Sequence, residues 1–125
     1  MGGAAHLVRG SISGVVLTES VSVTGGSGET LFDADPGRVQ APAPIVANRD
    51  DRCNVAPPEN AQKIASALTS SPDVRVLLVS GGIDRDANAC GSRSPHGYYY
   101  GIETEIVGKI ADWMDAHIKP PRVKR

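Results

Sequence analysis

The sequence has 125 residues, enough for one domain with a modest hydrophobic core. Its formal net charge of −1 and its isoelectric point of about 6.3 argue against nucleic acid or an anionic membrane as the main partner. Hydrophobic residues make up 40% of the chain, which argues against global disorder. No apolar run approaches the length of a membrane span, and Met1–Gly10 lacks the long apolar core of a signal peptide. The cellular location stays open.

The first segment, residues 1–13, is rich in small residues, and we expect a flexible start there. Within it, GSISG at Gly10–Gly14 is similar to the Gly-x-Ser-x-Gly turn that presents a nucleophilic serine. Its central residue is Ile12, however, and the motif precedes a strand instead of following one. The pattern therefore argues against a catalytic role for Ser11 or Ser13.

A first strand is predicted over Gly14–Ser20, GVVLTES, because its apolar run is continuous, as in a strand covered on both faces. Residues 21–42 then form a Gly-rich connector, with a short helical turn expected near Leu31–Asp35. The GGSG at Gly25–Gly28 lacks the Lys-Ser/Thr pair that a phosphate-binding loop needs. We therefore expect this segment to be a linker.

The stretch Ala43–Leu68 predicts a strand, a loop and an amphipathic helix. Ala43–Ala47 is a short apolar run typical of a buried strand. Pro57 and Pro58 suit the start of a helix, where their missing N–H groups cost nothing. One face of that helix is apolar at helical spacing: Ala61, Ile64, Ala65 and Leu68.

A second unit of the same kind follows, with a strand at Val74–Val79, a long loop at Ile83–Tyr100 and a helix from about Gly101 to Ile118. The helix has an apolar stripe that we expect to pack into the core: Ile102, Ile106, Ile110, Trp113 and Met114. Residues 119–125 are a basic, solvated tail. The predicted fold class is α/β, a small parallel sheet flanked by helices in one domain over residues 1–125.

Carboxylate and imidazole side chains follow two successive strands. Asp50 and Asp51 come after the strand at Ala43–Ala47, and His96 lies in the loop after the next strand. Because neighbouring parallel strands end at the same edge of a sheet, these loops can meet there. A histidine oriented by a carboxylate can act as a general base. The alternatives are an ordinary solvated turn for the aspartates and an ordinary loop histidine.

The two cysteines lie in the same two loops. A bridge between Cys53 and Cys90 would tie the acid loop to the histidine loop and close a loop of 90 − 53 = 37 residues. Two buried free thiols are the first alternative. A zinc site of Cys53, Cys90 and His96 is the second, although this spacing matches no standard zinc pattern.

These segments together resemble the C-terminal part of the α/β-hydrolase fold over roughly Gly14–His117. The resemblance is carried by GVVLTES, PIVANRDDRCNVAPPENAQKIASAL, VRVLLVSGG and SPHGYYYGIETEIVGKIADWM. In that family one strand ends in the catalytic acid, a helix follows, and the next strand leads to the catalytic histidine. The resemblance implies Asp51 as the acid, with Asp50 as second choice, and His96 as the general base. The three strands would be the last three of the family's sheet.

The chain departs from this family upstream. The nucleophile elbow and the oxyanion loop would both lie before Gly14–Ser20, and the lid is reduced to the Gly-rich connector. The resemblance therefore implies a truncated or split serine hydrolase for ester, amide or similar acyl bonds, with acid and base but no nucleophile. It implies no cofactor and a small acyl substrate in the complete form.

An upstream hydrolase segment or a second copy of the chain would be the protein partner. The alternative function is a non-catalytic α/β module that binds a partner, or a truncated product without separate activity. A Cys53–Cys90 disulfide would suit an exported parent protein.

Overall fold

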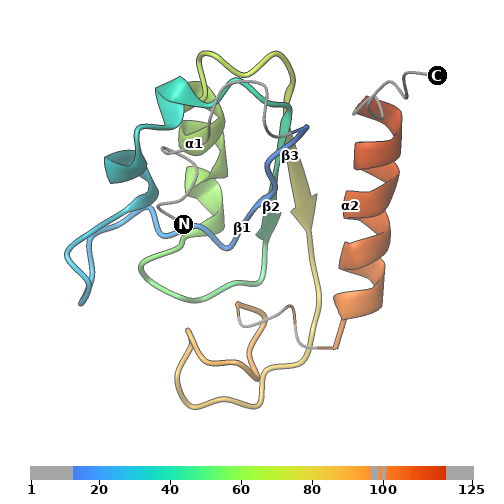
Figure 1. The fold of residues 1–125 in the computed structure, drawn as a ribbon. Helices are drawn as coiled ribbons and strands as arrows, with labels where there is room; N and C mark the ends of the chain where they lie inside the picture. The colour runs from blue at the N-terminus through green and yellow to red at the C-terminus, as the bar shows by residue number, and fades with distance from the viewer. Residues whose placement is uncertain (1–12, 97–98, 100, 118–125) are drawn as a thin grey trace.

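The computed structural model describes residues 13–96, 99 and 101–117 (Figure 1). Strands and helices follow one another in the predicted order. A short 3₁₀ helix lies at the turn predicted near Leu31–Asp35, and two further short 3₁₀ helices are present. The elements are β1 (Leu17–Thr18), η2 (Leu31–Ala34), η3 (Pro36–Arg38), β2 (Ala43–Asn48), η4 (Pro58–Asn60), α1 (Ala61–Ala67), β3 (Val74–Val79) and α2 (Glu103–His117). The predicted flexible start, apart from Ser13, and the basic tail at 119–125 lie outside the described residues.

The three strands form one parallel sheet in the order β1-β2-β3. Leu17 pairs with Ile45 and Ile45 pairs with Val76, so the strands run side by side without a shift that would separate their ends. The carboxyl ends of all three strands therefore lie at one edge of the sheet, which is where the predicted acid and histidine loops begin. The α/β class with a small parallel sheet is confirmed.

Helices α1 and α2 cover opposite faces of the sheet (Figure 1). Alternate residues of β2 point to the two faces: Ile45 packs with α1 and Val46 packs towards α2. The core on the α1 side is made of Leu17, Leu31, Val39, Ala43, Ile45, Ala61, Ile64 and Leu68. The smaller core on the α2 side is made of Val46, Val79, Tyr99 and Ile106.

The first strand is shorter than predicted. Only Leu17–Thr18 pair regularly with β2, although Val15 N–H still donates to the carbonyl oxygen of Pro42 at 2.9 Å. Glu19 follows with a positive φ of 48°, which ends the extended conformation. The apolar run that predicted a strand over Gly14–Ser20 thus identified its position and overstated its length.

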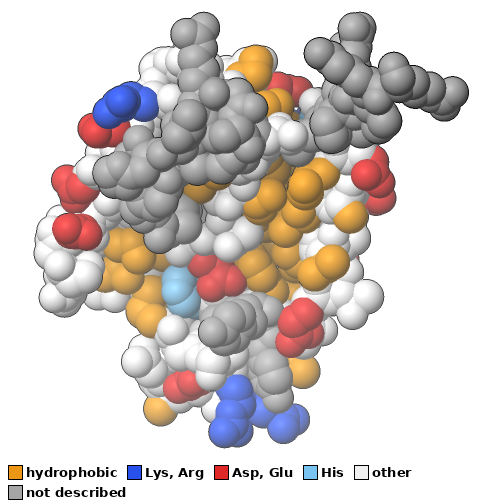
Figure 2. Space-filling view, in the orientation of Figure 1, with side chains coloured by type: hydrophobic (Ala, Val, Ile, Leu, Met, Phe, Trp, Pro, Cys, Tyr) orange, Lys and Arg blue, Asp and Glu red, His pale blue; other side chains and the backbone are white. Residues whose placement is uncertain are grey.

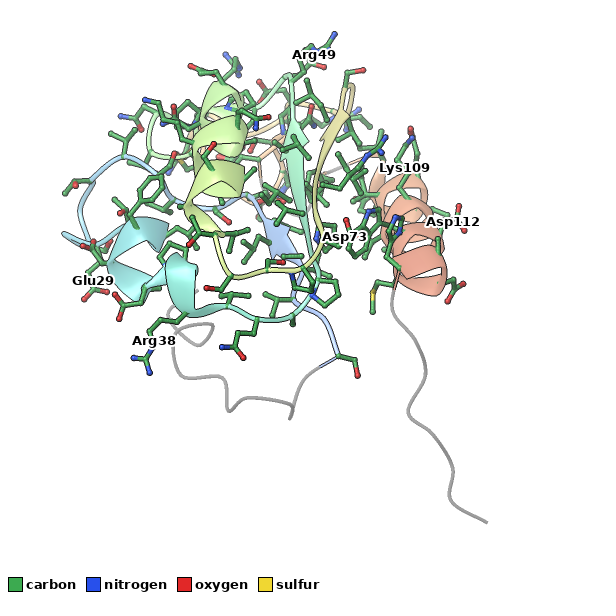
Figure 3. The ribbon with its side chains drawn as sticks, turned by 90° about the horizontal axis from the view of Figure 1, so that it is seen from above. Glu29, Arg38, Arg49, Asp73, Lys109 and Asp112 are labelled. Atoms are coloured by element: carbon green, nitrogen blue, oxygen red, sulfur yellow. A yellow bond between two sulfur atoms is a disulfide. The ribbon has the colours of Figure 1, made fainter. Side chains whose placement is uncertain are left out.

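The apolar stripe of α2 is only partly core. Ile106 and Trp113 are buried, whereas Met114 is 38% exposed and Val107 is 65% exposed. The opposite side of the helix presents charged residues such as Lys109 and Asp112 to solvent (Figure 3). Within the part of the chain that the structure describes, no helix combines the length and the apolar character needed to cross a bilayer.

Candidate active site

The acid loop begins directly at the end of β2. The N–H of Asp51 donates to the carbonyl oxygen of Asn48 at 3.0 Å, which turns the chain back over the sheet edge. Asp51 Oδ1 then accepts a hydrogen bond of 2.8 Å from the N–H of Cys53. Only 3% of the Asp51 side chain is exposed. This local bond, of the kind that short acidic side chains make to the backbone two residues on, fixes the carboxylate in one orientation.

The histidine loop is organised around Ser94, which is also buried. Its hydroxyl donates to the carbonyl oxygens of Gly91 at 2.7 Å and Ala89 at 3.1 Å. The same oxygen accepts a hydrogen bond of 3.2 Å from the backbone N–H of His96. Ser94 therefore holds the backbone on both sides of a tight turn and sets the position from which the imidazole enters the site.

The two loops bring Asp51 and His96 into direct contact. His96 Nδ1 lies 2.8 Å from Asp51 Oδ2, although 45 residues separate them in the chain. The predicted approach within hydrogen-bonding reach is confirmed. Because an ionised carboxylate can only accept, this contact places a proton on Nδ1 and leaves Nε2 as the second ring nitrogen of the site. The hydrogen bond to Asp51 raises the pKa of His96 above its ordinary value of 6.5, against an opposing effect of burial.

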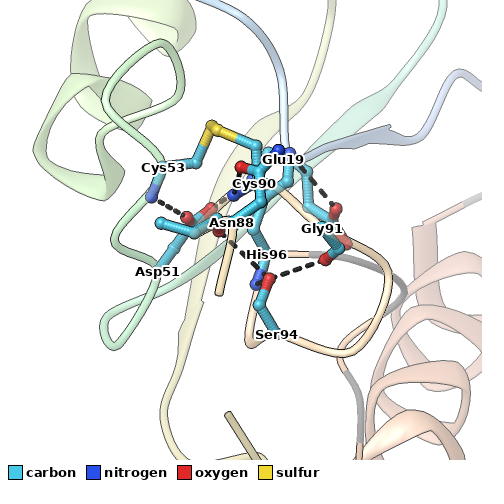
Figure 4. The surroundings of a disulfide bond; sticks show 9 residues. Glu19, Asp51, Cys53, Asn88, Cys90, Gly91, Ser94 and His96 are labelled. Carbon is cyan, nitrogen blue, oxygen red and sulfur yellow. Dashed lines mark hydrogen bonds and ion pairs between the residues drawn. A yellow bond between two sulfur atoms is a disulfide. The ribbon is translucent and has the colours of Figure 1, made fainter. Parts of the chain in front are cut away.

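A disulfide joins the same two loops. Cys53 and Cys90 are bonded, with their Cα atoms 4.7 Å apart (Figure 4). The predicted bridge is confirmed, and the alternative of two free thiols is wrong. The zinc alternative fails for the same reason, since both sulfur atoms are used in the covalent bond. The bridge lies two residues from Asp51 and six from His96, so it restrains both loops close to the point where they touch.

Asn48, the last residue of β2, is a second link between the loops that the sequence reasoning missed. Its side chain is 1% exposed. Nδ2 donates to the carbonyl oxygens of Gly81 at 3.0 Å and Pro95 at 3.4 Å, and Oδ1 accepts from the N–H of Asp50 at 2.9 Å. A polar residue at the end of a buried strand is the sequence signal that points to such a role.

Glu19 is a third acidic residue at the site and was also missed. Its Oε2 lies 3.9 Å from His96 Nε2, on the side of the ring opposite to Asp51. The Glu19 side chain is 16% exposed. Burial is the main cause that raises its pKa to about 7; the nearby charge of Asp51 adds to this and His96 opposes it. His96 therefore lies between two carboxylates, with Asp51 at Nδ1 and Glu19 on the side of Nε2.

Asp50, the second-choice acid, lies away from the imidazole. Its Oδ2 accepts a hydrogen bond of 2.6 Å from the N–H of Gly81, across the entrance to the next loop. It lines an open groove of about 400 Å³ together with Arg49, Arg52, Gly81, Gly82, Asp84 and Pro95. Arg52 pairs with Asp84 in this groove, and Arg49 projects outward from the end of β2 (Figure 3).

Neither Ser20 nor Ser22 hydrogen-bonds to the histidine ring. Ser22 Oγ accepts a hydrogen bond from Asn60 Nδ2 at 3.1 Å, and Ser20 Oγ is buried without a hydrogen-bond partner in the described structure. Ser13 is exposed, and Ser11 lies outside the described residues. Among the described residues, the charged group nearest to His96 Nε2 is a carboxylate.

The arrangement is a buried carboxylate–imidazole pair at the carboxyl edge of a parallel sheet. Such a pair can accept a proton at Nε2, and the Asp51 carboxylate stabilises the imidazolium that forms. Within the described residues, no three His, Cys, Asp or Glu side chains are grouped to hold a metal ion. No protein-family model, no curated protein and no solved structure matches this chain.

Proposed function

We propose that this chain carries the acid and the base of a serine-hydrolase-type acyl-transfer site of the α/β-hydrolase fold, with Asp51 as the acid and His96 as the general base. The observation that carries the proposal is the 2.8 Å contact between His96 Nδ1 and Asp51 Oδ2 at the carboxyl edge of the sheet. The order strand–acid–helix–strand–histidine–helix supports it. The substrate class is a small molecule with an ester, amide or similar acyl bond.

In this reaction the two residues have separate roles. His96 Nε2 accepts the proton of an attacking hydroxyl and later returns a proton to the leaving group. Asp51 keeps the imidazole in the required tautomer and stabilises the imidazolium that forms. The hydrogen bond from the Cys53 N–H to Asp51 Oδ1 suits this role. It orients the carboxylate before the positive charge forms on the imidazole, so the carboxylate does not have to reorient during the reaction.

The proposal requires a nucleophilic hydroxyl and oxyanion donors from outside the described residues. No described serine hydrogen-bonds to His96 Nε2, and the sequence contains no Gly-x-Ser-x-Gly turn. An upstream hydrolase segment would supply the missing groups next to β1. Within the described sheet β1 is an edge strand, because β2 is its single neighbour. The neighbouring upstream reading frame can be inspected for a strand–Gly-x-Ser-x-Gly–helix segment.

One observation favours a second candidate, a non-catalytic α/β module that binds a partner. A carboxylate, Glu19, and not a hydroxyl lies beside His96 Nε2. In that case the Asp51–His96 pair would be a buried hydrogen bond that stabilises two loops, without a reaction to serve. The two candidates differ in whether Nε2 reacts with an acyl compound.

The test is hydrolysis of p-nitrophenyl acetate, an activated ester on which an imidazole with an available Nε2 can act. We expect p-nitrophenol release above the buffer rate, its loss in His96→Ala and its reduction in Asp51→Asn. His117→Ala is the matched control, because His117 lies on α2 and hydrogen-bonds to the carbonyl oxygen of Trp113. Equal rates in the wild type and in His96→Ala would show that Nε2 does not act on an acyl compound in this chain and would favour the binding module.

A further inference from the structure

The histidine loop has little to hold it in place besides the disulfide. Residues 80–93 are all exposed or half-buried, and neither of the two core clusters contains any of them. Within the part of the chain that the structure describes, residues 85–93 hydrogen-bond only to one another and to Ser94. The bond from Cys90 to Cys53 therefore ties this part of the loop to the acid loop.

The disulfide belongs to a closed set of contacts that includes the acid–base pair. On one side, the Cys53 N–H donates to Asp51 Oδ1 at 2.8 Å. On the other, the Ser94 hydroxyl donates to the carbonyl oxygens of the two residues that flank Cys90 and accepts from the N–H of His96. The contact between His96 Nδ1 and Asp51 Oδ2 closes the set (Figure 4). Because the disulfide is the covalent member of the set, opening it frees Cys90 and, through Ser94, the backbone that carries His96.

After the disulfide opens, few bonds remain to keep the imidazole in place. Asn48 Nδ2 still reaches the carbonyl oxygen of Pro95, at the long distance of 3.4 Å. The His96 side chain is 14% exposed, and Figure 2 shows a histidine side chain at the surface beside acidic and hydrophobic side chains. The imidazole can therefore turn towards water without opening either core. Water then competes for Nδ1 and for the Asp51 carboxylate, and the conformational entropy of the freed loop favours the separated state.

We propose that the Cys53–Cys90 disulfide is a redox-sensitive switch of the acid–base pair. A dithiol reductant opens the bond from the side of Cys90, the contact between Asp51 and His96 is lost, and the core of the domain stays folded. Oxidation of the two thiols restores the contact. This inference goes beyond the proposed function, because it concerns the contact itself and holds with or without an acyl substrate.

The two cysteines differ in their access to solvent, which sets the direction of the exchange. Cys53 is 1% exposed, whereas Cys90 is an exposed residue. A thiolate of the dithiol attacks Cys90 Sγ, and the electron pair of the broken S–S bond goes to Cys53 Sγ, which takes up a proton. The second thiolate of the dithiol then attacks the mixed disulfide and releases Cys90, which is also protonated. Both cysteines are reduced to thiols, and the dithiol is oxidised to its own disulfide.

The test is NMR of the full chain with and without dithiothreitol, in the absence of denaturant. In the oxidised chain the pKa of His96 should lie above 6.5, because Asp51 hydrogen-bonds to the ring and the charges of Asp51 and Glu19 add to this effect. In the reduced chain the pKa should fall towards 6.5, and the resonance of the Nδ1 proton should be lost. The indole N–H resonance of Trp113, the single tryptophan, should keep its folded position in both states. Mass spectrometry after alkylation should find two new thiols.

A Cys53→Ser, Cys90→Ser variant is the matched control, because it cannot form the bridge. Its His96 pKa should equal that of the reduced wild type and should not respond to dithiothreitol, which excludes a direct effect of the reductant on the ring. His117 serves as an internal control, since it lies on α2 and hydrogen-bonds to the carbonyl oxygen of Trp113. The titration of His117 should be the same in the oxidised and reduced chains.

Three results would overturn the inference. The first is a disulfide that dithiothreitol does not reduce in the folded chain. The second is a reduced chain that keeps the oxidised pKa of His96. The third is loss of the folded Trp113 resonance on reduction, which would show that the bridge holds the whole domain together. All three use the wild-type chain, so they remain decisive if the double variant fails to fold. None of them measures turnover, and hydrolysis of p-nitrophenyl acetate by the oxidised chain tests the proposed function separately.

Discussion

The side-chain amide of Asn48 donates a hydrogen bond of 3.0 Å to the carbonyl oxygen of Gly81, across the carboxyl edge of the sheet. The same amide group reaches Pro95, the residue before His96. Asn48 also accepts a hydrogen bond from the N–H of Asp50, the residue before Asp51. One buried side chain therefore connects the backbones that carry both members of the candidate acid–base pair.

Asn48→Ala should destabilise the protein by about 2–3 kcal/mol, because it leaves buried carbonyl oxygens and a backbone N–H without partners. Urea denaturation measures this change. Asn54→Ala is the matched control, since Asn54 is exposed on the following loop and its replacement should change stability by about 0.5 kcal/mol or less. Equal effects of the two substitutions would contradict the bracing role.

The pKa of His96 should lie above 6.5 in the wild type and fall in Asp51→Asn, which removes the charge that stabilises the imidazolium. Because the folded-state pKa is raised, the stabilisation is fully present below the unfolded value of 6.5 and is lost as pH rises through the folded value. NMR titration of the His96 ring gives the pKa directly. His117→Ala should leave the His96 titration unchanged, and a His96 pKa that is the same in Asp51→Asn would refute the coupling.

Glu19→Gln should change how stability depends on pH. The folded-state pKa of Glu19, about 7, lies above its ordinary value of 4.5, so the folded protein holds a proton that the unfolded chain has released. This contribution favours folding at low pH and is lost as pH rises from about 4.5 to 7. Thermal unfolding at pH 5 and pH 8 should therefore show Glu19→Gln gaining stability relative to the wild type at the higher pH.

Glu29→Gln controls for the loss of one negative charge, since Glu29 is exposed. The pH dependence of thermal stability should change more between the wild type and Glu19→Gln than between the wild type and Glu29→Gln. A Glu19→Gln variant that tracks the wild type at both pH values would show that the Glu19 carboxylate is not buried in solution.

Reduction of the Cys53–Cys90 disulfide should cost about 4 kcal/mol, the value that the chain-entropy treatment gives for a closed loop of 37 residues. Urea denaturation with and without a reductant measures this loss. A Cys53→Ser, Cys90→Ser double variant should show the lower stability and no further response to the reductant. Thiol titration of the unfolded, oxidised protein should find no free thiol, and two free thiols would contradict the bridge.

The 125-residue chain should not react stoichiometrically with a fluorophosphonate probe. A serine needs a base within hydrogen-bonding reach and a sharp turn that exposes it, and neither Ser20 nor Ser22 has both in the described structure. Mass spectrometry with peptide mapping checks this. Modification of one serine that disappears in His96→Ala would show that the chain contains its own nucleophile.

Much of the fold could be predicted because its signals are local. The apolar runs at Ala43–Ala47 and Val74–Val79 predicted β2 and β3 to within one residue. The helical spacing after Pro58 predicted α1. The approach of the acid loop to the histidine loop followed from the parallel order of the strands, because parallel strands end at the same edge of the sheet. These predictions need only the periodicity of side chains and the geometry of a sheet.

Other features depended on contacts between residues far apart in the chain. Asp50 and Asp51 are adjacent and have the same side chain. The turn after Asn48 and the hydrogen bond from the Cys53 N–H direct Asp51 to the imidazole. The spacing of the cysteines left three chemical alternatives open until the two loops were placed side by side.

The sequence by itself determined the α/β class, the positions of β2, β3 and the helices, and the two loops that meet. Only the tertiary structure decided that Glu19 leaves β1 in the left-handed conformation and faces the second nitrogen of His96. The physical reason is that strand and helix patterns arise from neighbouring residues. The position and protonation of a buried side chain arise instead from everything that surrounds it after folding.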